Sequence, residues 1–300
     1  MKQAALFPGQ GSQIVGMGRA FFEASEQAKA LFKRADEVLG FSLSKLCFEG
    51  PLEELTLTQN AQPAILVTSY VCFVHTDADF VAAAGHSLGE YTALVAAGVL
   101  SFEDAVLLVR KRGTYMQEAV PAGKGKMVAV MGPSEAEIRE VIGAISTGIP
   151  ESAHLNSPGE HVVAGDIAGV DGFSELMKTK GGKIIPLNVS APFHCSLMRP
   201  AAEKLAGDLK SVTFNNSRFP VYANVTAAAV KNSDEARLLL EQQVCGSVRW
   251  TDSMQRLVEE QNIERVVEFG PGGVLSKLMK RITKQVGALE VSAPEHLATL

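Results

Sequence analysis

Short, fully apolar runs alternate along this chain with longer stretches whose apolar residues recur at helical spacing. Residues 4–7 and 80–84 are such short runs, which are typical of strands buried on both faces in a parallel sheet. Helical stretches are predicted at 17–39 and 62–74, and a third, at 88–97, follows the second strand at once. Strands that alternate with helices indicate an α/β core with a doubly wound sheet.

The middle of the chain has a different order of elements. Strands are predicted at 127–131, 152–156, 161–165 and 183–189. Two amphipathic helices separate them, with apolar faces made of Ile138, Val141, Ile142 and Ile145 and of Val170, Phe173 and Met177. This β-α-β-β-α-β order is the ferredoxin-like arrangement. We therefore expect residues 125–190 to form an inserted subdomain, and residues 1–124 and 191–300 to form the core.

The core pattern resumes after Pro192, with strands predicted at 219–225 and 265–269. A glycine-rich turn, residues 270–273, follows the second strand and precedes a helix whose apolar face consists of Leu275, Leu278, Met279 and Ile282. The opposite face of that helix carries Lys277, Lys280, Arg281 and Lys284. This basic face is either a docking surface for an acidic partner or an ordinary solvated helix face.

Composition narrows the classes of protein that fit this pattern. Of the 300 residues, 46% are hydrophobic and 20% are charged, which excludes a disordered chain. With 28 Lys and Arg against 33 Asp and Glu, the net charge of −5 argues against nucleic acid or an anionic membrane as the main partner. The four cysteines include no CxxC pair, and no apolar run approaches the roughly 20 residues of a membrane span. We expect a soluble, cytoplasmic protein with reduced thiols.

The pentapeptide Gly85-His86-Ser87-Leu88-Gly89 fits the G-x-S-x-G pattern and lies between a predicted strand and a predicted helix. That context is typical of a nucleophile elbow, a turn so sharp that a Cβ at either glycine would collide with backbone. The turn would lift the Ser87 hydroxyl clear of the sheet and place it at a helix N-terminus, beside the Leu88 N–H as an oxyanion donor. The alternative is a tight strand–helix turn with an idle serine.

A nucleophilic serine needs a base, and His194 is the best candidate among the six histidines. It lies where the chain leaves the predicted insert and returns to the core, so a structural junction histidine is the alternative. Asp166 and Asp171 are acids between the serine and the histidine in chain order, but a position near the start of a helix does not suit a triad. A backbone carbonyl could orient the histidine instead, which would give a dyad.

The glycine-rich loop 8–13, after the first strand, could supply a second oxyanion donor from its backbone. It contains neither GxxxxGK[ST] nor GxGxxG, which weakens the alternative of a phosphate loop. Arg112, just before Gly113, is expected near the end of a helix that begins near Phe102. It could be a dipole partner at that end or a buried fork for a carboxylate, and the spacing does not choose between them. The chain has no HExxH or paired-cysteine pattern, so we expect no metal site.

Seven segments together resemble the malonyl-CoA:acyl-carrier-protein transacylases, the acyltransferases of type II fatty acid synthesis. They occur in the family's order, and the set is specific although each segment alone is weak evidence. The segments are FPGQGSQ (7–13), GHSLGEY (85–91), KRGTYMQEAVP (111–121), NSPGEHVVAG (156–165), VSAPFHCSLMRPA (189–201), SVRW (247–250) and EFGPGGVL (268–275).

The resemblance implies a hydrolase-like α/β core with a mostly parallel sheet, together with the ferredoxin-like insert. It also implies a ping-pong transfer of malonyl from malonyl-CoA to the phosphopantetheine thiol of an acyl carrier protein, through a malonyl-serine intermediate. Ser87 would be the acylated nucleophile, His194 its base, and Arg112 the partner of the malonyl carboxylate. The backbone N–H groups of Gln10 and Leu88 would form the oxyanion hole.

In this family a backbone carbonyl from the residue before the tryptophan of SVRW orients the histidine, and here that residue is Arg249. Gln62 and Asn156 match positions near the family's pocket. Phe193 matches a position where phenylalanine accompanies a preference for malonyl over methylmalonyl in related polyketide acyltransferases. The resemblance implies no bound cofactor, because the CoA thioester is a substrate. The implied partners are malonyl-CoA and, transiently, an acyl carrier protein, and we expect a monomer that binds neither nucleic acid nor membrane.

Three alternatives remain open on the sequence. A free-standing acyltransferase that loads a polyketide assembly line would share these motifs. A serine thioesterase or esterase would need an acid partner and an HGGG-type loop, which the sequence does not offer in a suitable place. A non-catalytic carrier-binding or scaffold domain would have no need of Ser87, His194 and Arg112.

Overall fold

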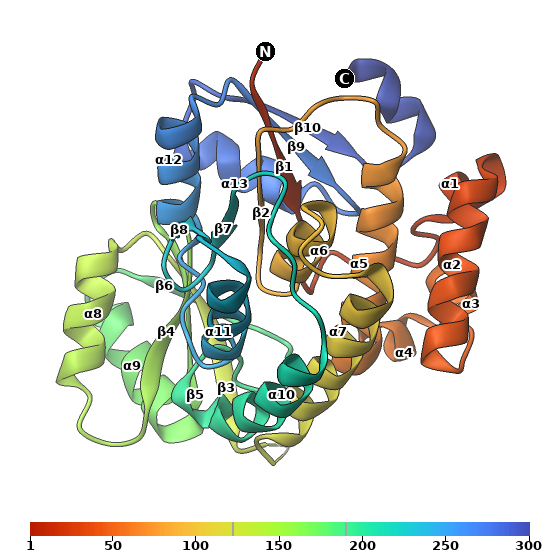
Figure 1. The fold of residues 1–300 in the computed structure, drawn as a ribbon. Helices are drawn as coiled ribbons and strands as arrows, with labels where there is room; N and C mark the ends of the chain where they lie inside the picture. The colour runs from red at the N-terminus through yellow and green to blue at the C-terminus, as the bar shows by residue number, and fades with distance from the viewer. Residues whose placement is uncertain (122, 190) are drawn as a thin grey trace.

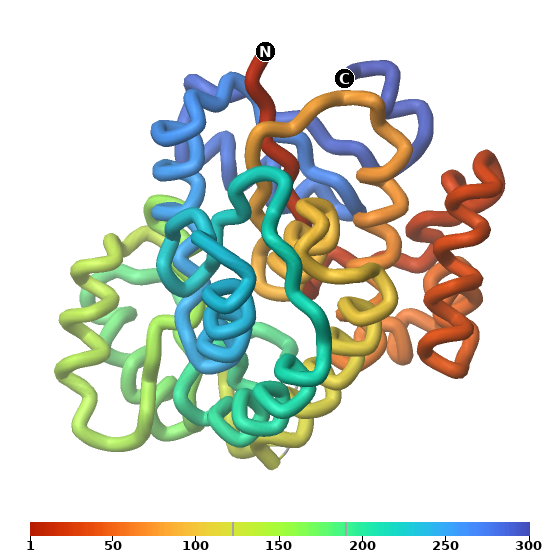
Figure 2. Tube along the Cα trace, in the orientation of Figure 1, coloured from red at the N-terminus to blue at the C-terminus, as the bar shows by residue number. Residues whose placement is uncertain are grey.

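A computed structural model describes residues 1–121, 123–189 and 191–300 of the chain. Its strands form two sheets, one of six strands and one of four. Figures 1 and 2 show the smaller sheet, in green, at one end of the molecule, with both chain termini at the opposite end. Ser190, where we expected the insert to end, lies outside the described residues.

The six-stranded sheet has the order β10-β9-β1-β2-β7-β8. Its strands are β1 (Gln3–Phe7), β2 (Ala82–Gly85), β7 (Val221–Ala223), β8 (Ala228–Ala229), β9 (Arg265–Phe269) and β10 (Gly287–Val291). All paired neighbours run parallel except β7 and β8. The prediction of a mostly parallel sheet is therefore confirmed.

Side-chain alternation along β1 divides the core into two layers. Ala5 and Phe7 belong to the cluster with α5 (Thr58–Val74), α6 (Gly89–Ala96) and α7 (Phe102–Glu118). Ala4 and Leu6 belong to a second cluster, with α12 (Trp250–Gln261) and α13 (Val274–Ile282). Because helices cover both faces of the sheet, both sets of side chains along the central strand are apolar.

Four helices precede α5 in the chain and lie at its outer side, in red and orange in Figure 1. They are α1 (Arg19–Ala24), α2 (Glu26–Leu39), α3 (Leu43–Glu49) and α4 (Leu52–Thr56). The single helix predicted at 17–39 is wrong, because the chain breaks at Ser25. Ser25 is extended (φ −141°, ψ 128°), and its side chain accepts a hydrogen bond from the N–H of Ala28. It is therefore the N-cap at which the second helix begins.

The four-stranded sheet is antiparallel throughout, with the order β4-β5-β3-β6. In chain order its elements are β3 (Gly125–Met131), α8 (Glu135–Ala144), β4 (Pro150–Ser157), β5 (Glu160–Asp166), α9 (Ile167–Thr179) and β6 (Lys183–Pro186). A capping box of Ser134 and Glu137 is present at the start of α8. Both helices contribute to a separate apolar cluster with Val128 and Val130 of β3.

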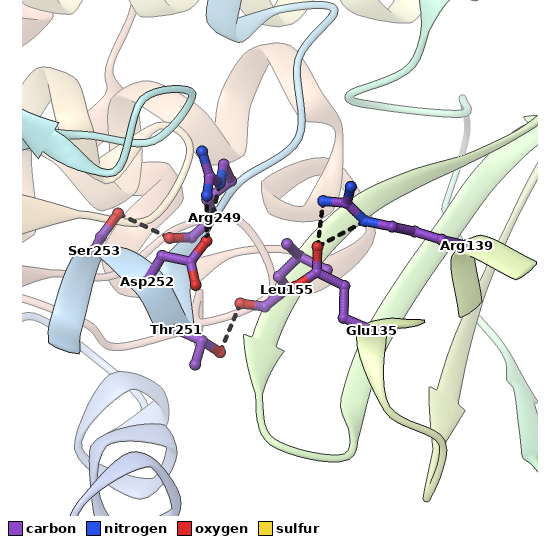
Figure 3. A network of polar contacts seen from close by, with 7 residues as sticks. All are labelled: Glu135, Arg139, Leu155, Arg249, Thr251, Asp252 and Ser253. Carbon is purple, nitrogen blue, oxygen red and sulfur yellow. Dashed lines mark hydrogen bonds and ion pairs between the residues drawn. The ribbon is translucent and has the colours of Figure 1, made fainter. Parts of the chain in front are cut away.

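The two sheets meet where β4 passes the start of α12. The N–H of Leu155 donates to the carbonyl of Val248 at 2.9 Å, and the N–H of Val248 donates to the carbonyl of Ala153 at 2.8 Å. Thr251 adds a side-chain bond to the carbonyl of Leu155 at 3.1 Å (Figure 3). These bonds hold the smaller sheet against the end of α12 nearest the elbow.

The remaining helices are α10 (Arg199–Ser211) and α11 (Ser233–Gln243), with 3-10 turns at η1 (Ser196–Met198) and η2 (Pro294–Thr299). α10 packs against both α7 and α11, so the return from the smaller sheet is joined to the core. Within the described ranges, none of the helices is long and apolar enough to cross a membrane.

Candidate active site

The turn between β2 and α6 has the geometry expected of a nucleophile elbow. A Cβ at Gly85 would lie 1.9 Å from the backbone of Gly89, and one at Gly89 would lie 2.0 Å from the carbonyl oxygen of Phe7. Neither position therefore admits a side chain. Ser87 has a φ of 52°, in the left-handed region that costs a non-glycine residue energy.

Asn224, which follows β7, holds this turn in place. Its Oδ1 accepts a hydrogen bond from the N–H of Ser87 at 2.7 Å, and its Nδ2 donates to the carbonyl of Gly85 at 2.8 Å. One side chain thus satisfies two backbone groups of the turn, at the strained residue and two residues before it. Sequence reasoning missed Asn224, because nothing local connects it with an elbow 137 residues earlier.

His194 lies beside the serine, as expected. Its Nε2 is 2.7 Å from Oγ of Ser87, and its ring is 2% exposed. Its Nδ1 faces two backbone carbonyl oxygens, those of Gln243 at 2.9 Å and Gly246 at 3.1 Å. Carbonyls only accept, so Nδ1 carries the proton and Nε2 is left to accept from the hydroxyl. The two groups form a serine–histidine pair oriented by backbone.

The expectation that Arg249 supplies the orienting carbonyl is wrong. The Arg249 carbonyl accepts from the N–H of Ser253 at 2.9 Å and from its Oγ at 2.8 Å (Figure 3). Arg249 is the N-cap of α12, so its carbonyl makes the first helical bond. Gln243 is the last residue of α11, where carbonyls are left without helical partners. The predicted end of the helix before SVRW could have identified the Gln243 carbonyl from the sequence.

Burial and charge keep the imidazole of His194 neutral. Burial, assisted by the positive charge of Arg112, lowers its pKa to about 3. Asp166 and Asp171, the acids considered from the sequence, are engaged elsewhere: Asp166 caps α9, and Asp171 pairs with Lys126 at 2.5 Å. Within the described ranges, no carboxylate contacts His194.

Arg112 lies in the interior of a helix and not at its end. α7 continues through Gly113 to Glu118, which contradicts the expected C-cap. A Cβ at Gly113 would lie 2.7 Å from the backbone of Gln59, so the glycine permits close packing of α7 on α5. That packing turns Arg112, at 1% exposed, toward the serine.

The guanidinium of Arg112 is held by three oxygen atoms. Nη1 donates to Oε1 of Gln62 at 2.8 Å, while Nη2 donates to Oε1 of Gln243 at 2.9 Å and to Oγ of Ser87 at 3.0 Å. The guanidinium carbon also lies 5.6 Å from the ring centre of Tyr91. In the part of the chain that the structure describes, no acidic side chain forms an ion pair with Arg112. It is a buried cation beside a nucleophile, an arrangement suited to a small anion.

A cavity of about 420 Å³ lies over these groups, between the elbow and the smaller sheet. It is lined by nearly all of the residues singled out from the sequence and by side chains from β3, β4 and α13: Gln10, Gln62, Ser87, Leu88, Arg112, Asn156, Phe193, His194, Met127, His154, Val274 and Leu278. Residues from distant segments thus meet at one pocket.

Two backbone N–H groups at this cavity lack an acceptor. Those of Gln10 and Leu88 have no hydrogen-bond partner among the described residues. A Cβ at Gly9 would lie 2.5 Å from the carbonyl of His86, so the loop 8–13 rests directly on the elbow. Two free backbone donors at one cavity match the pattern that stabilises an oxyanion.

The cavity region also contains three imidazoles that face one another in a row. The ring centre of His154 lies 5.1 Å from that of His194 and 4.9 Å from that of His86. Nε2 of His86 donates to Oδ1 of Asn156 at 3.0 Å. Burial lowers the pKa of His86 to about 4 and lowers that of His154 well below its ordinary value.

Cys195, next to the histidine in sequence, does not take part. Its Sγ donates to the carbonyl of Pro192, and burial raises its pKa to about 12. Such a thiol is a poor nucleophile. Within the described ranges, no cluster of His, Cys, Asp or Glu is arranged to hold a metal ion.

The comparisons with known proteins agree with this geometry. Residues 5–295 match the family described as acyl transferase domain. A malonyl CoA-acyl carrier protein transacylase of Bacillus subtilis (strain 168) is 45% identical over 304 aligned residues, with 99% of this chain and 95% of the relative covered. This chain belongs to the malonyl CoA-acyl carrier protein transacylase family.

Solved structures of this family have the same fold. The acyl carrier protein S-malonyltransferase of Vibrio cholerae O1 superimposes with a TM-score of 0.97 at 39% identity, covering 100% of this chain and 99% of the other. A malonyl-transacylase in complex with a type II PKS acyl-carrier protein matches with a TM-score of 0.95 at 38% identity, covering 100% and 98%. The resemblance stated from the sequence motifs is therefore confirmed.

Proposed function

We propose that this chain transfers malonyl from malonyl-CoA to the phosphopantetheine thiol of an acyl carrier protein. One observation carries the proposal. Oγ of Ser87 lies 2.7 Å from Nε2 of His194 and 3.0 Å from Nη2 of Arg112, so one hydroxyl touches both a base and a buried cation. The names of the relatives, which are malonyl CoA-acyl carrier protein transacylases, support this choice of acyl group and acceptor.

In the first half-reaction, Ser87 attacks the thioester carbonyl while His194 takes the hydroxyl proton. A C–O bond forms, the C–S bond breaks, and His194 returns the proton to the departing CoA sulfur. Malonyl-Ser87 remains. In the second half-reaction the carrier thiol gives its proton to His194 and attacks the ester carbonyl. A C–S bond forms, the C–O bond to Ser87 breaks, and His194 returns the proton to the serine oxygen. Two large thiols can then use one cavity in turn, which is a ping-pong mechanism.

We assign the oxyanion hole to the N–H groups of Gln10 and Leu88. Both residues line the cavity, and neither N–H has a partner among the described residues. Leu88 belongs to the elbow and Gln10 to the loop that rests on it. Removing one such donor from an acyl-transfer enzyme costs about 3 kcal/mol in the transition state. The position of Leu88, as the N-cap of α6, adds the positive end of a helix dipole.

Arg112 is assigned to the malonyl carboxylate. A guanidinium binds a carboxylate with two parallel hydrogen bonds, and the carboxylate would displace its weaker contact with the hydroxyl of Ser87. Gln62 holds Nη1 from α5 and so orients the fork. Acetyl has no carboxylate to place there, so the cation favours malonyl.

The architecture that frames this reaction is assigned as a hydrolase-like core, residues 1–124 and 191–300, with a ferredoxin-like insert, residues 125–190. The strand order β4-β5-β3-β6 and the two helices on one side of the smaller sheet support that assignment. The insert forms one wall of the cavity through Met127, His154 and Asn156. We further propose a cytoplasmic monomer that needs no bound cofactor.

Carrier protein is proposed to dock at the basic face of α13. Val274, Leu275 and Leu278 of this helix line the cavity, while Lys277 and Lys280 are exposed. Lys284 is also exposed, but it lies beyond the helix, which ends at Ile282 and not, as expected, after Lys284. Arg281 is already paired with Glu160 at the start of β5 in the smaller sheet. An acidic carrier would therefore meet lysines beside the cavity.

A second candidate is the loading of a polyketide carrier, because one close structural neighbour is a malonyl-transacylase bound to a type II PKS acyl-carrier protein. Its chemistry at Ser87 is the same, and only the carrier differs. Equal amounts of the two kinds of holo-carrier, offered together to the malonylated chain, would separate the candidates by which one is labelled first.

The proposed function is tested with malonyl-CoA labelled in the acyl group. We expect label on the Ser87 peptide after incubation, and its transfer to holo-carrier when that is added. Ser87→Ala should abolish the adduct and Cys195→Ser should retain it. Label on a cysteine contradicts the nucleophile assignment, and loss of label to water faster than to carrier indicates a thioesterase.

A further inference from the structure

Glu90 is a buried carboxylate beside the reacting groups that the proposed reaction does not use. It lies in the first turn of α6, and it is 1% exposed. Its Oε2 accepts hydrogen bonds from the N–H of Asn224 at 2.9 Å and from Nε2 of Gln243 at 2.8 Å. Burial of a carboxylate is unfavourable unless a nearby cation or several donors compensate for the lost solvation.

Gln243 connects this carboxylate to Arg112. Its Nε2 donates to Glu90 and also to the carbonyl of Ser87 at 2.9 Å. The opposite end of the amide, Oε1, therefore faces Arg112 and accepts from Nη2 at 2.9 Å. The backbone carbonyl of the same residue accepts from Nδ1 of His194. By accepting from Nε2, Glu90 fixes which end of the amide meets the guanidinium.

Electrostatic interactions also link Glu90, Arg112 and His194. Burial lowers the pKa of Arg112, and the charge of Glu90 on α6 acts in the opposite direction. Tyr91, on the same helix, is neutral because burial raises its pKa. Arg112 on α7 is in turn the charged group that acts on Glu90, and it also acts on His194. Glu90 is the carboxylate of this set, and it compensates the cation through one intervening amide. A direct ion pair would occupy the donors that a substrate carboxylate needs.

We propose that Glu90 is the counter-charge and positioning residue of Arg112 in the empty site, and that it takes up a proton when a malonyl carboxylate pairs with Arg112. This rests on the function proposed above, because malonyl must bind at the guanidinium. Two carboxylates then share one buried cation, and the one without direct contact is the weaker partner. The proton comes from solvent, binds a Glu90 carboxylate oxygen, and is released when the malonyl group leaves.

The state of Glu90 before substrate arrives makes this exchange accessible near neutral pH. Burial raises its pKa to about 7, although the hydrogen bonds from Asn224 and Gln243 and the charge of Arg112 act in the opposite direction. When the malonyl carboxylate offsets the charge of Arg112, the pKa of Glu90 rises further. Protonated Glu90 still offers a carbonyl oxygen to Asn224 and Gln243, so the amide keeps its orientation.

The test counts protons bound with the ligand, in a Ser87→Ala chain that cannot be acylated. Calorimetric titration with malonyl-CoA at about pH 7.5, in two buffers of different ionisation enthalpy, should show uptake of roughly half to one proton per ligand. Acetyl-CoA carries the same CoA moiety without the carboxylate and should show no such uptake. Failure to bind malonyl-CoA at all contradicts the proposed function, whereas binding with equal proton uptake for both ligands overturns the role of Glu90 alone.

A charge-free variant locates the proton. Glu90→Gln keeps an acceptor oxygen for Asn224 and Gln243, so we expect a folded chain in which the malonyl-specific uptake is lost. In the otherwise unaltered enzyme the KM for malonyl-CoA should rise with pH above about 7, by up to ~10-fold per unit, and Glu90→Gln should remove that rise. Glu268→Gln, at another buried glutamate on β9, is the matched control and should change neither quantity. A merely structural role for Glu90 would lower stability and leave the pH dependence of KM intact.

A measurement without substitution at Glu90 covers the case in which that variant does not fold. Infrared difference spectra of the Ser87→Ala chain with malonyl-CoA against acetyl-CoA should show a protonated carboxyl band in the malonyl complex. Malonyl labelled with ¹³C shifts the ligand's own bands and leaves that of Glu90 in place. Absence of the unshifted band overturns the proposal.

Discussion

Arg112 and Ser87 are in direct contact, with Nη2 of the guanidinium 3.0 Å from Oγ of the hydroxyl. The hydroxyl accepts this bond and donates to His194, so its proton already points at the base. The contact also sets a length scale, because an acyl group on Oγ can reach the guanidinium only if its carboxylate is near the ester. A malonyl group, with a single methylene between its two carbonyl carbons, meets that condition.

Arg112→Ala should reduce kcat/KM for malonyl-CoA by about 100-fold or more, because a buried charge pair loses one partner. The kcat/KM for acetyl-CoA should fall far less, because the acetyl group has no carboxylate to pair with the guanidinium. Rates of acyl-enzyme formation with both thioesters check this. Lys111→Ala is the control, since Lys111 lies on the same helix but is half-exposed and pairs with Asp208. Equal decreases in kcat/KM for malonyl-CoA and acetyl-CoA would show that Arg112 does not bind the malonyl carboxylate.

Acylation of Ser87 should stay fast to unusually low pH. His194 must be neutral to accept a proton, and burial with the charge of Arg112 lowers its pKa to about 3. An ordinary imidazole loses its base form below about pH 6.5. We expect the single-turnover rate of acylation to be unchanged from about pH 7 to 5, within the range where the fold persists. An acid limb near the ordinary histidine value would contradict the neutral, buried base.

Folding stability should decline below about pH 6.5. The pKa values of His86, His154 and His194 are all lowered in the folded chain, so the unfolded chain takes up protons that the folded one cannot. Glu90 acts in the opposite direction, because its raised pKa lets the folded chain protonate first. Three groups against one give a loss of up to about 3 kcal/mol per pH unit between about pH 6 and 5. Urea unfolding measures this slope, which His154→Gln should reduce by roughly half, because it leaves a net difference of one proton in place of two; an unchanged slope would contradict the assignment.

Asn224→Ala should lower kcat with little change in KM. The variant removes the side-chain bonds to Ser87 N–H and the Gly85 carbonyl, which hold the elbow in its strained shape. Loss of two buried hydrogen bonds should also lower the free energy of unfolding by about 2 kcal/mol. Asn232→Ala, at the N-cap of α11, is the control and should cost about 1 kcal/mol without lowering kcat. A full kcat in Asn224→Ala would show that the glycines alone maintain the turn.

Charge reversal at Lys277 and Lys280 should raise the KM for acyl carrier protein by about 10-fold and leave that for malonyl-CoA unchanged, because rim charges chiefly affect encounter. High salt should reduce the difference between the variant and the original chain. Lys178→Glu, on α9 of the smaller sheet, is the matched control. An unchanged KM for the carrier would show that this surface is an ordinary solvated helix face.

Local physical constraints explain what could be predicted from the sequence. Apolar runs such as residues 4–7 show a strand with both faces buried, because a polar side chain is costly to bury in a sheet that is covered on both sides. Gly85 indicates the elbow, since a Cβ there would collide with the backbone of Gly89, only four residues away. Gly89 is required for another reason, the close approach of the Phe7 carbonyl from β1, which depends on the packing of the sheet. The capping box of Ser134 and Glu137 is equally local and is present.

Tertiary structure decided the features that depend on which distant segments meet. Ser87 and His194 are 107 residues apart, and only the packing of the smaller sheet and α11 brings them together. The same packing turns Gln243, and not Arg249, toward the imidazole, because a carbonyl at the end of α11 is free whereas one at the start of α12 is used by its own helix. The role proposed for Glu90 depends on its contact with Gln243 and on the contact of Gln243 with Arg112. No spacing in the sequence relates these three residues to one another.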